Sequence, residues 1–347
     1  MKSSRWVSVG ISALAWMLIS APVFAQKTPR AVSYGSKNAP TDIPSGIKDL
    51  IKNAKKKTVF EVVGLTTFSD QVLKTDKLIF EPGATLALSS LRSDSLVIIA
   101  GEIVLQDPKT SSQIIRDPSF QANAGSSGAQ GGLGQPDYTP PHATYRSANG
   151  GPGGAGGNGT SGEVVKPPTV YLLVGKMNHP AIPSRFIIDF GGVQGGPGGS
   201  GGTGGTGGHG DVGWPGSSNF WGCQSGPGRG GDGGPGGLGG RGADAVPGGP
   251  GFDLLLGGQD DFVNLADQFT IINKGGDPGA PGVAGRGGAG GQRGQGGQTT
   301  PGCSPRGDGV DGAPGGSQGP GSSTTASGAA GLITFAYGLN VSALLGP

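Results

Sequence analysis

The chain has 347 residues, of which 76 are Gly and 28 are Pro, together about 30% of the sequence. This composition alone would indicate disorder, but the Gly is periodic and the blocks between its runs are rich in Ile, Leu, Val and Phe. The chain carries 25 Lys plus Arg against 23 Asp plus Glu, and loss of Lys2 and Arg5 with an N-terminal signal leaves 23 against 23. A neutral chain lacks the basic surface that nucleic acid or an anionic membrane attracts, so neither partner is expected.

Residues 1–25 have the features of a secretory signal peptide. Lys2 and Arg5 form a basic start, Val7 to Leu18 an apolar core, and Val23-Phe24-Ala25 a cleavage site. A membrane anchor is the alternative, but the apolar core is shorter than the roughly 18 residues that a spanning helix needs, and no later segment reaches that length. We therefore expect secretion to the periplasm, the outer surface or the extracellular space after cleavage near Ala25, without membrane insertion.

Residues 26–43 resemble a flexible leader, and residues 44–105 are expected to hold a capping helix and the first strands. The helix should open at Pro44-Ser45-Gly46 and run to about Lys55, because Ile47, Leu50, Ile51 and Ala54 share one helical face. The strand-like pieces that follow are Val59–Val63, Leu78–Phe80, Ala84–Leu88, Leu96–Ile99 and Ile103–Leu105.

Two of these stretches, LIFEPGATLAL and LVIIAGEIVL, share an apolar run, a Gly turn and a second apolar run. Their starts, Leu78 and Leu96, lie 18 residues apart, which predicts successive rungs of a short β-solenoid, with the helix capping its open end. An antiparallel sandwich is the alternative. Further rung strands are expected at Val170–Gly175, Phe186–Gly191, Phe252–Leu256, Phe269–Ile272 and Leu332–Phe335.

The rest of the chain, 106–347, interleaves rungs with three Gly-rich excursions at 106–169, 193–251 and 275–330. Structureless loops of this length are improbable in a compact domain, and three of similar length indicate a repeated design. Each excursion contains two Gly runs around a middle without periodic Gly. The first run ends near Gly134. The other five span Gly150–Gly162, Gly195–Gly213, Gly228–Gly251, Gly276–Gly297 and Gly307 to about Gly321.

Gly at every third position indicates a threefold helix of the polyproline-II type, which leaves its own backbone groups unpaired. A face made of Gly lets a neighbouring backbone approach closely enough to pair those groups. Runs such as GGPGGSGGTGGTGGHG have two Gly faces, which suits a sheet-like or hexagonal bundle of polyglycine-II hairpins. The run from Gly276 has mostly one Gly face and should lie at the margin. Collagen remains the alternative, and it would require three chains in register.

The GGx runs resemble the polyglycine-II bundles of the snow-flea antifreeze protein and of the tip adhesins of some T-even-like phages, and the whole resembles exported bacterial collagen-like proteins. The resemblance covers about 125–330 and rests on periodicity. In the phage adhesins, loops at the end of the bundle recognise the receptor, which implies the same role for the three middles here. Antifreeze function would need a flat, regular surface of Thr or Ala, and Thr203 and Thr206 are the one such pair in the runs.

The middles of the excursions hold the residues that the sequence offers for binding. Cys223 and Cys303, an even number of cysteines in an exported chain, lie in two different middles and predict a disulfide between them. Exposed aromatic rings suit sugar stacking or protein contact, although a small hydrophobic clasp is an equal alternative. The binding candidates are Tyr138, His142, Tyr145, Arg146, Trp214, Phe220, Trp221 and Arg306.

Signals for metal, cofactor or catalytic sites are poor. His142, His179 and His209 show no ligand spacing, GGHGDVG places Asp211 one position too early for a calcium nonapeptide, and no phosphate-binding loop occurs. Solenoid enzymes that cleave polysaccharides use carboxylates of neighbouring rungs, and Asp189, Asp253 and Asp260-Asp261 are candidates, although solvated strand ends explain them equally.

The sequence therefore predicts a mainly β protein, with a short β-solenoid, an N-terminal capping helix and three packed polyglycine-II hairpins. The expected function is a secreted structural or adhesive protein whose tips bind a glycan or a cell-surface protein, without metal or cofactor. The alternative is a secreted polysaccharide lyase or hydrolase on a β-solenoid. The sequence does not indicate the oligomeric state.

Overall fold

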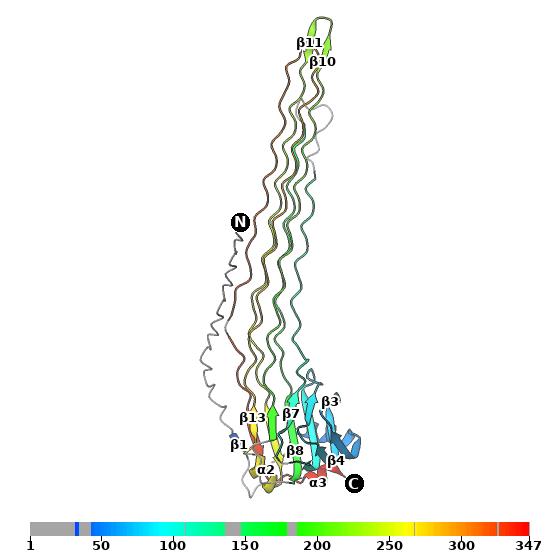
Figure 1. The fold of residues 1–347 in the computed structure, drawn as a ribbon, viewed down its shortest axis with the longest axis vertical. Helices are drawn as coiled ribbons and strands as arrows, with labels where there is room; N and C mark the ends of the chain where they lie inside the picture. Colours follow the sequence, from blue (N-terminus) through cyan, green and yellow to red (C-terminus); the bar gives the residue numbers. More distant parts are fainter. Residues whose placement is uncertain are drawn as a thin grey trace, which may run out of the picture.

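The computed structural model describes residues 32–34, 43–107, 109–135, 147–178, 186–266, 268–324 and 326–346. The signal sequence 1–25, His179 and the first-excursion candidates Tyr138, His142, Tyr145 and Arg146 lie outside these residues. Within them the protein is mainly β, with two parallel sheets and few helices. A long bundle of extended segments rises from one end of the sheets (Figure 1).

The two sheets are built by strands that alternate between them along the chain. The seven-stranded sheet has the order β1 (Val32–Tyr34), β14 (Ile333–Ala336), β12 (Leu254–Gly258), β8 (Thr169–Met177), β6 (Ser95–Leu105), β4 (Val72–Phe80) and β2 (Lys56–Val62). The five-stranded sheet has the order β13 (Thr270–Ile272), β9 (Phe186–Asp189), β7 (Ser112–Arg116), β5 (Thr85–Leu88) and β3 (Leu65–Phe68). Every pair in both sheets is parallel, so the antiparallel sandwich is wrong.

Buried side chains fill the space between the sheets and also cover the outer face of the larger one. In β6, Leu96 and Ile98 belong to the core between the sheets, whereas Val97 and Ile99 pack in a second cluster with helices α1 (Ser45–Asn53) and α3 (Val341–Leu345). Burial on both faces explains why this strand is apolar without alternation. Helix α2 (Asp260–Ala266) adds Phe262 to the first core, where β12 turns towards β13.

The helix opening at Ser45 is confirmed, but its predicted position at the open end of the strands is wrong. α1 packs on the outer face of the larger sheet, because its buried Ile47 and Ile51 share a cluster with Val97 and Ile99. The buried ammonium of Lys74 in β4 donates to the carbonyl of Ile51 at 3.1 Å and holds the end of the helix to the sheet. The edge strand β2 therefore keeps a mostly exposed face.

The predicted register of the first rungs is also wrong. Leu96–Ile99 and Ile103–Leu105 form one continuous strand through Gly101, where a Cβ would lie 2.8 Å from the carbonyl oxygen of Asp76. Leu78 consequently pairs with Ile103 and not with Leu96. Strand β7 lies in the segment expected to be the first excursion, and β1 lies in the segment expected to be a leader. Strand β3 and helices α2 and α3 were also not predicted.

Three long hairpins continue from the sheets as six extended legs. We number them leg 1 (123–135), leg 2 (147–163), leg 3 (192–216), leg 4 (226–251), leg 5 (273–298) and leg 6 (306–331). Odd legs follow strands of the smaller sheet, and even legs lead into strands of the larger one. The two layers of strands therefore continue as two layers of legs, 1-3-5 and 2-4-6.

Backbone hydrogen bonds between 2.6 and 3.2 Å connect the legs in a regular order. In leg 3, Gly198, Gly201 and Gly204 donate to leg 5, whereas the next residues in the run, Gly199 and Gly202, donate to leg 2. Legs 3 and 4 each bond with four other legs and leg 5 with three, which confirms the marginal position expected for the run from Gly276. The two Gly faces of an inner leg thus serve two sets of neighbours.

The third position of each triplet faces outward, and its side chain often bonds to the next leg of the same layer. Asn149 and Asn158 of leg 2 accept backbone N–H groups of leg 4, Asp232 and Asp244 of leg 4 accept those of leg 6, and His209 of leg 3 accepts that of Gln292. These acceptors pair N–H groups that the Gly faces do not reach.

An ion pair fastens the first hairpin to the sheets. Arg92, before β6, donates to both carboxylate oxygens of Glu163 in leg 2 at 2.6 and 3.0 Å, and the backbone N–H of Asn123 in leg 1 donates to the same carboxylate. These bonds, led by the one from Arg92, lower the pKa of Glu163 from 4.5 to about 2.

The substitution Gly205→Ala should destabilise the bundle. A Cβ at Gly205 would overlap the carbonyl oxygen of Gly132, and relief of the overlap requires a backbone shift that breaks inter-leg bonds. We expect a loss of about 1–3 kcal/mol, seen as a lower midpoint of thermal unfolding by circular dichroism. Gly316→Ala is the control, because its Cβ would meet only the Leu238 side chain at 3.6 Å. Equal midpoints for the two variants would contradict the close approach.

The substitution Glu163→Gln should lower stability at neutral pH. The pKa of Glu163 is depressed in the folded state, so the ionised clamp stabilises the fold above about pH 4.5 and is lost as the pH falls towards 2. The difference in unfolding midpoint between wild type and variant should therefore narrow over that range. A difference that stays constant with pH would show that the ionised carboxylate is not responsible.

Candidate functional site

The far end of the bundle is formed by legs 3 to 6 alone among the described residues. The hydroxyl of Ser147, where leg 2 begins, donates to the carbonyls of Val212 and Arg229, so legs 1 and 2 reach only this level. Leg 3 continues for four residues beyond Val212, and Gly216 still donates to Gln298 of leg 5. The predicted second and third tips therefore lie together, away from the sheets (Figure 1).

A small antiparallel hairpin lies at this end of the bundle. Strands β10 (Ser217–Asn219) and β11 (Gly222–Ser225) pair with Asn219 opposite Gly222, so Phe220 and Trp221 are its two turn residues. The Asn219 side chain accepts the N–H of Trp221 at 2.9 Å, and Gly222 has a φ of 120° that a Cβ would strain. A loop of two residues has no room to fold its side chains back onto the strands.

The two turn residues are almost fully exposed aromatic rings. Phe220 is 93% and Trp221 89% exposed, and the rings contact each other edge to face with centroids 5.5 Å apart. A hydrophobic clasp between the tips would bury these rings, and the structure does not bury them. Trp214 lies before the hairpin in leg 3, is 50% exposed, and accepts the N–H of Gly228 on its carbonyl.

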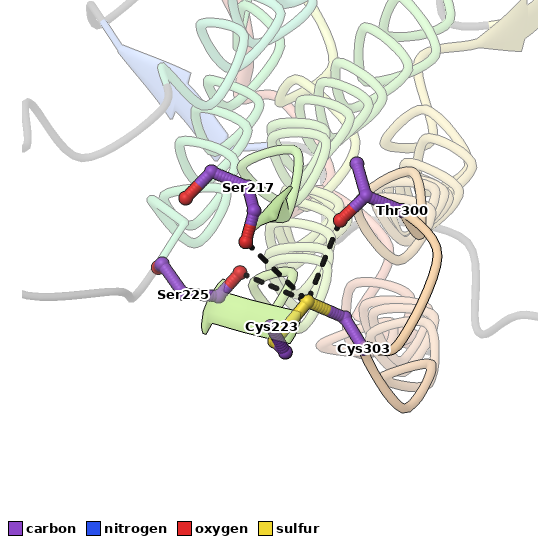
Figure 2. The surroundings of a disulfide bond; sticks show 5 residues. All are labelled: Ser217, Cys223, Ser225, Thr300 and Cys303. Carbon is purple, nitrogen blue, oxygen red and sulfur yellow. Dashed lines mark hydrogen bonds between the residues drawn. A yellow bond between two sulfur atoms is a disulfide. The ribbon is translucent and has the colours of Figure 1, made fainter. Parts of the chain in front are cut away.

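The predicted disulfide is present and joins the two tips. Cys223 of β11 bonds to Cys303 in the turn between legs 5 and 6, 80 residues later (Figure 2). The hydroxyl of Thr300 donates to the sulfur of Cys303 at 3.4 Å, and the carbonyl oxygens of Ser217 and Ser225 lie 3.5 and 3.4 Å from the same sulfur. The hairpin is thereby tied to the neighbouring pair of legs.

The apex, defined as residues 214–226 and 299–305, contains no charged residue. Its polar groups are hydroxyls and amides, among them Ser217, Ser218, Asn219, Gln224 and Thr299. Arg306 is exposed at the start of leg 6, next to the apex, and its carbonyl lies against Gly296. The apex therefore offers aromatic faces and uncharged hydrogen-bonding groups to a ligand.

Two of the carboxylates considered for catalysis, Asp189 and Asp253, accept backbone hydrogen bonds. Asp189 accepts the N–H of Gly191 at 3.1 Å, and Asp253 accepts that of Leu332 at 2.8 Å, where strands meet legs. Asp189 lines a shallow hollow of about 380 Å³ together with Arg116 and Lys274, but Arg116 donates to the carbonyl of Gly191. Asp260 and Asp261 begin α2. Asp189 and Asp253 thus organise the junctions between strands and legs, whereas one carboxylate oxygen of Asp260 is buried without a hydrogen-bond partner among the described residues.

The hairpin was the element that sequence reasoning missed at this end. Its signal was present as Asn219 and Gly222 separated by two residues, a pattern suited to a two-residue turn. The Gly-poor middle was instead treated as an irregular loop, because strands of three and four residues are too short to show alternation.

Comparison with known proteins identifies no family for this chain, so a functional proposal rests on the geometry of the site. No family model and no curated protein matches the chain. A solved structure, the nine polyproline type II helical bundle springtail antifreeze protein from Granisotoma rainieri, is 23% identical over 53% of this chain and 91% of its own, with a TM-score of 0.08. That score carries no argument about fold or function. Among the described residues, no helix has the length and apolar character to cross a membrane.

Removal of the disulfide should loosen the apex. Closure of an 80-residue loop corresponds to about 4.5 kcal/mol in the chain-entropy model. We expect Cys223→Ser/Cys303→Ser to lower the unfolding midpoint and to speed hydrogen exchange at 217–225 and 299–305. Peptide mapping without reduction should recover Cys223 and Cys303 in one linked peptide. Separate peptides from unreduced wild type would rule out the bond.

Proposed function

We propose that this chain is an exported, non-enzymatic structural or adhesive protein whose apex binds a glycan or a cell-surface protein. The observation that carries the proposal is the pair of almost fully exposed rings, Phe220 and Trp221, at the end of a hydrogen-bonded bundle. Large exposed aromatic side chains are costly in water and are enriched at recognition sites. Their place at the point farthest from the sheets suits contact with another surface.

The proposed architecture is a short β-solenoid that carries a polyglycine-II bundle. Alternation of consecutive strands between two parallel sheets supports the solenoid, and N–H bonds to a given neighbour from every third residue support threefold legs. In that geometry the 25 residues of leg 3, from 192 to 216, would span roughly 75 Å, at about 3.1 Å per residue. The bundle would hold the apex at this distance from the sheets.

The chemistry of the apex favours an uncharged ligand surface. Aromatic faces stack on sugar rings, and hydroxyl and amide groups match sugar hydroxyls without the desolvation cost of a charge. The same set would also suit the polar rim and aromatic centre of a protein interface. Export is supported by the signal features of residues 1–25 and by the disulfide, which persists in oxidising compartments.

The double variant Phe220→Ala/Trp221→Ala should lose binding while it remains folded. Aromatic anchors at recognition sites cost at least about 2 kcal/mol when truncated, which is roughly a thirtyfold loss of affinity. Binding would be measured on a glycan array and on whole cells or extracellular matrix. Val283→Ala is the control, because Val283 is 64% exposed on the flank of leg 5.

Three results would count against this function. Unchanged binding by the double variant would move the site away from the apex. A lowered unfolding midpoint in that variant would favour a clasp. Turnover of a polysaccharide by the wild-type protein would favour the carbohydrate-active enzyme.

A further inference from the structure

The outer face of the layer formed by legs 2, 4 and 6 is a second exposed surface of the bundle. Leg 4 runs along its middle and directs every third side chain outward, because the residues between them donate to neighbouring legs. The outward residues of leg 4 are, in chain order, Arg229, Asp232, Pro235, Leu238, Arg241 and Asp244. Each Arg pairs with the Asp three residues later, with nitrogen and oxygen 2.8 Å apart, and all four charged side chains stay at least 36% exposed.

The charges of leg 4 are their own complement when the row is read in the opposite direction. Reversal about the midpoint of the apolar centre places Arg229 at the position of Asp244, and Asp232 at the position of Arg241. Every positive position then coincides with a negative one. The apolar centre itself, a proline and a leucine that are both exposed, coincides with its own reverse.

Leg 2, on one side of leg 4, has the same midpoint. The side chain of Asn149 accepts the N–H of Asp232, and that of Asn158 accepts the N–H of Arg241. The midpoint between the two Asn is therefore level with the midpoint of leg 4. The outward residues between them, a proline and an alanine, are exposed. Reversal thus places amide on amide and apolar side chain on apolar side chain.

Leg 6, on the other side of leg 4, leaves room for a close approach. Its Val310 and Ser322 donate backbone N–H groups to Asp232 and Asp244, which fixes its level. The outward residues between these two are small: Ala313, Gly316 and Gly319. A second flat surface would therefore meet no large side chain here.

We infer that the 2-4-6 faces of two copies of this chain pack against each other with their legs antiparallel. The twofold axis lies in the interface, perpendicular to the legs, and crosses leg 4 at the middle of its apolar centre. Arg229 then faces Asp244 of the second copy, and Asp232 faces Arg241 of the second copy. Each ion pair of one chain meets one of the other in a group of four alternating charges. Such complementarity across an isologous interface fixes register and orientation.

The same charges exclude the neighbouring arrangements. A parallel pairing of the two faces would place each Arg of leg 4 over the same Arg of the second copy. Displacement of one antiparallel chain by one triplet would place Arg229 over Arg241, or Asp232 over Asp244, depending on its direction. Like charges across an interface are costly. The register centred on the apolar residues is the one that apposes all four charges with opposite ones.

The face is large enough for a stable dimer. In the proposed threefold geometry residues 229–244 span roughly 46 Å, and three legs at the spacing of hydrogen-bonded backbones, about 5 Å, are roughly 15 Å wide. The face therefore covers about 700 Å² per chain, close to the roughly 800 Å² per partner that stable interfaces bury.

The rest of the molecule does not obstruct this pairing. Helices α1 and α3 cover the outer face of the larger sheet, beyond the point where leg 4 enters β12. From the twofold axis, β12 begins about 54 Å away, whereas leg 4 and the hairpin of the second copy reach only about 45 Å in that direction. Each apex would therefore lie beside the legs of the other copy, before its sheets. The pairing does not depend on what the apex binds.

Charge swaps that keep an Arg and an Asp in each pair of leg 4 test the dimer. The first swap is Arg229→Asp/Asp232→Arg, and the second is Arg241→Asp/Asp244→Arg. By size exclusion with light scattering at micromolar concentration, wild type should have twice the chain mass. Either swap alone should halve that mass, because like charges then face each other. An equimolar mixture of the two swaps, and the chain that carries both, should recover the dimer, because opposite charges again face each other.

The swap Arg293→Asp/Asp308→Arg is the matched control. This ion pair joins leg 5 to leg 6 away from the 2-4-6 face, and its Asp also accepts a backbone N–H. The control therefore loses the same kind of bond without a change of net charge, and it should remain dimeric. Arg229→Glu is a second test that leaves every Asp acceptor in place, and it should be monomeric with unchanged circular dichroism.

Three results would overturn the inference. The first is a monomeric wild type. The second is a wild-type dimer whose mass Arg229→Glu leaves unchanged. The third is a pair of folded swaps that stay monomeric when mixed. Apex binding is measured separately with Phe220→Ala/Trp221→Ala, so failure of the dimer and failure of the proposed function are distinguishable.

Discussion

The structure depends on the hydrogen bond from every third backbone N–H of a leg to a carbonyl of its neighbour. An extended segment outside a sheet leaves its polar groups unpaired, and burial of such groups is costly unless they bond. The bond requires contact between Cα and the opposing carbonyl, and at most inner positions a Cβ would overlap that carbonyl. The high Gly content, which is typical of disordered chains, is therefore explained by the short distance between each Cα atom and the opposing carbonyl. The legs have almost no apolar core, and their cohesion is carried by backbone groups.

The sheets decide which legs meet. Odd legs grow from adjacent strands of the smaller sheet and even legs return to adjacent strands of the larger one, so the strand order sets the leg order in each layer. Large buried side chains, such as Phe80, Phe186 and Phe252, are concentrated between the sheets. The hydrophobic core between the sheets thus aligns the legs. The ion pair between Arg92 and Glu163 fastens the first hairpin to the sheets.

Side chains of varied chemistry occur at the positions that the contacts between legs do not restrict to Gly. Outward positions carry side chains that pair leftover N–H groups, as Asp232 and Asp244 do. At the apex the triplet rule ends, and a two-residue turn directs Phe220 and Trp221 into solvent. At the opposite part of the molecule, β2 ends the larger sheet and, among the described residues, pairs only with β4.

The sequence by itself determined the Gly periodicity, the number of runs, the helix start at Ser45 and the pairing of Cys223 with Cys303, because each depends on local residue types or on a single possible partner. Only the tertiary structure decided that β6 runs through Gly101, that α1 covers a sheet face and that Phe220 and Trp221 form a turn. Parallel partners come from segments far apart in the chain, as Leu96 and Val170 do. Their register depends on side chains of both sheets, which no local pattern contains.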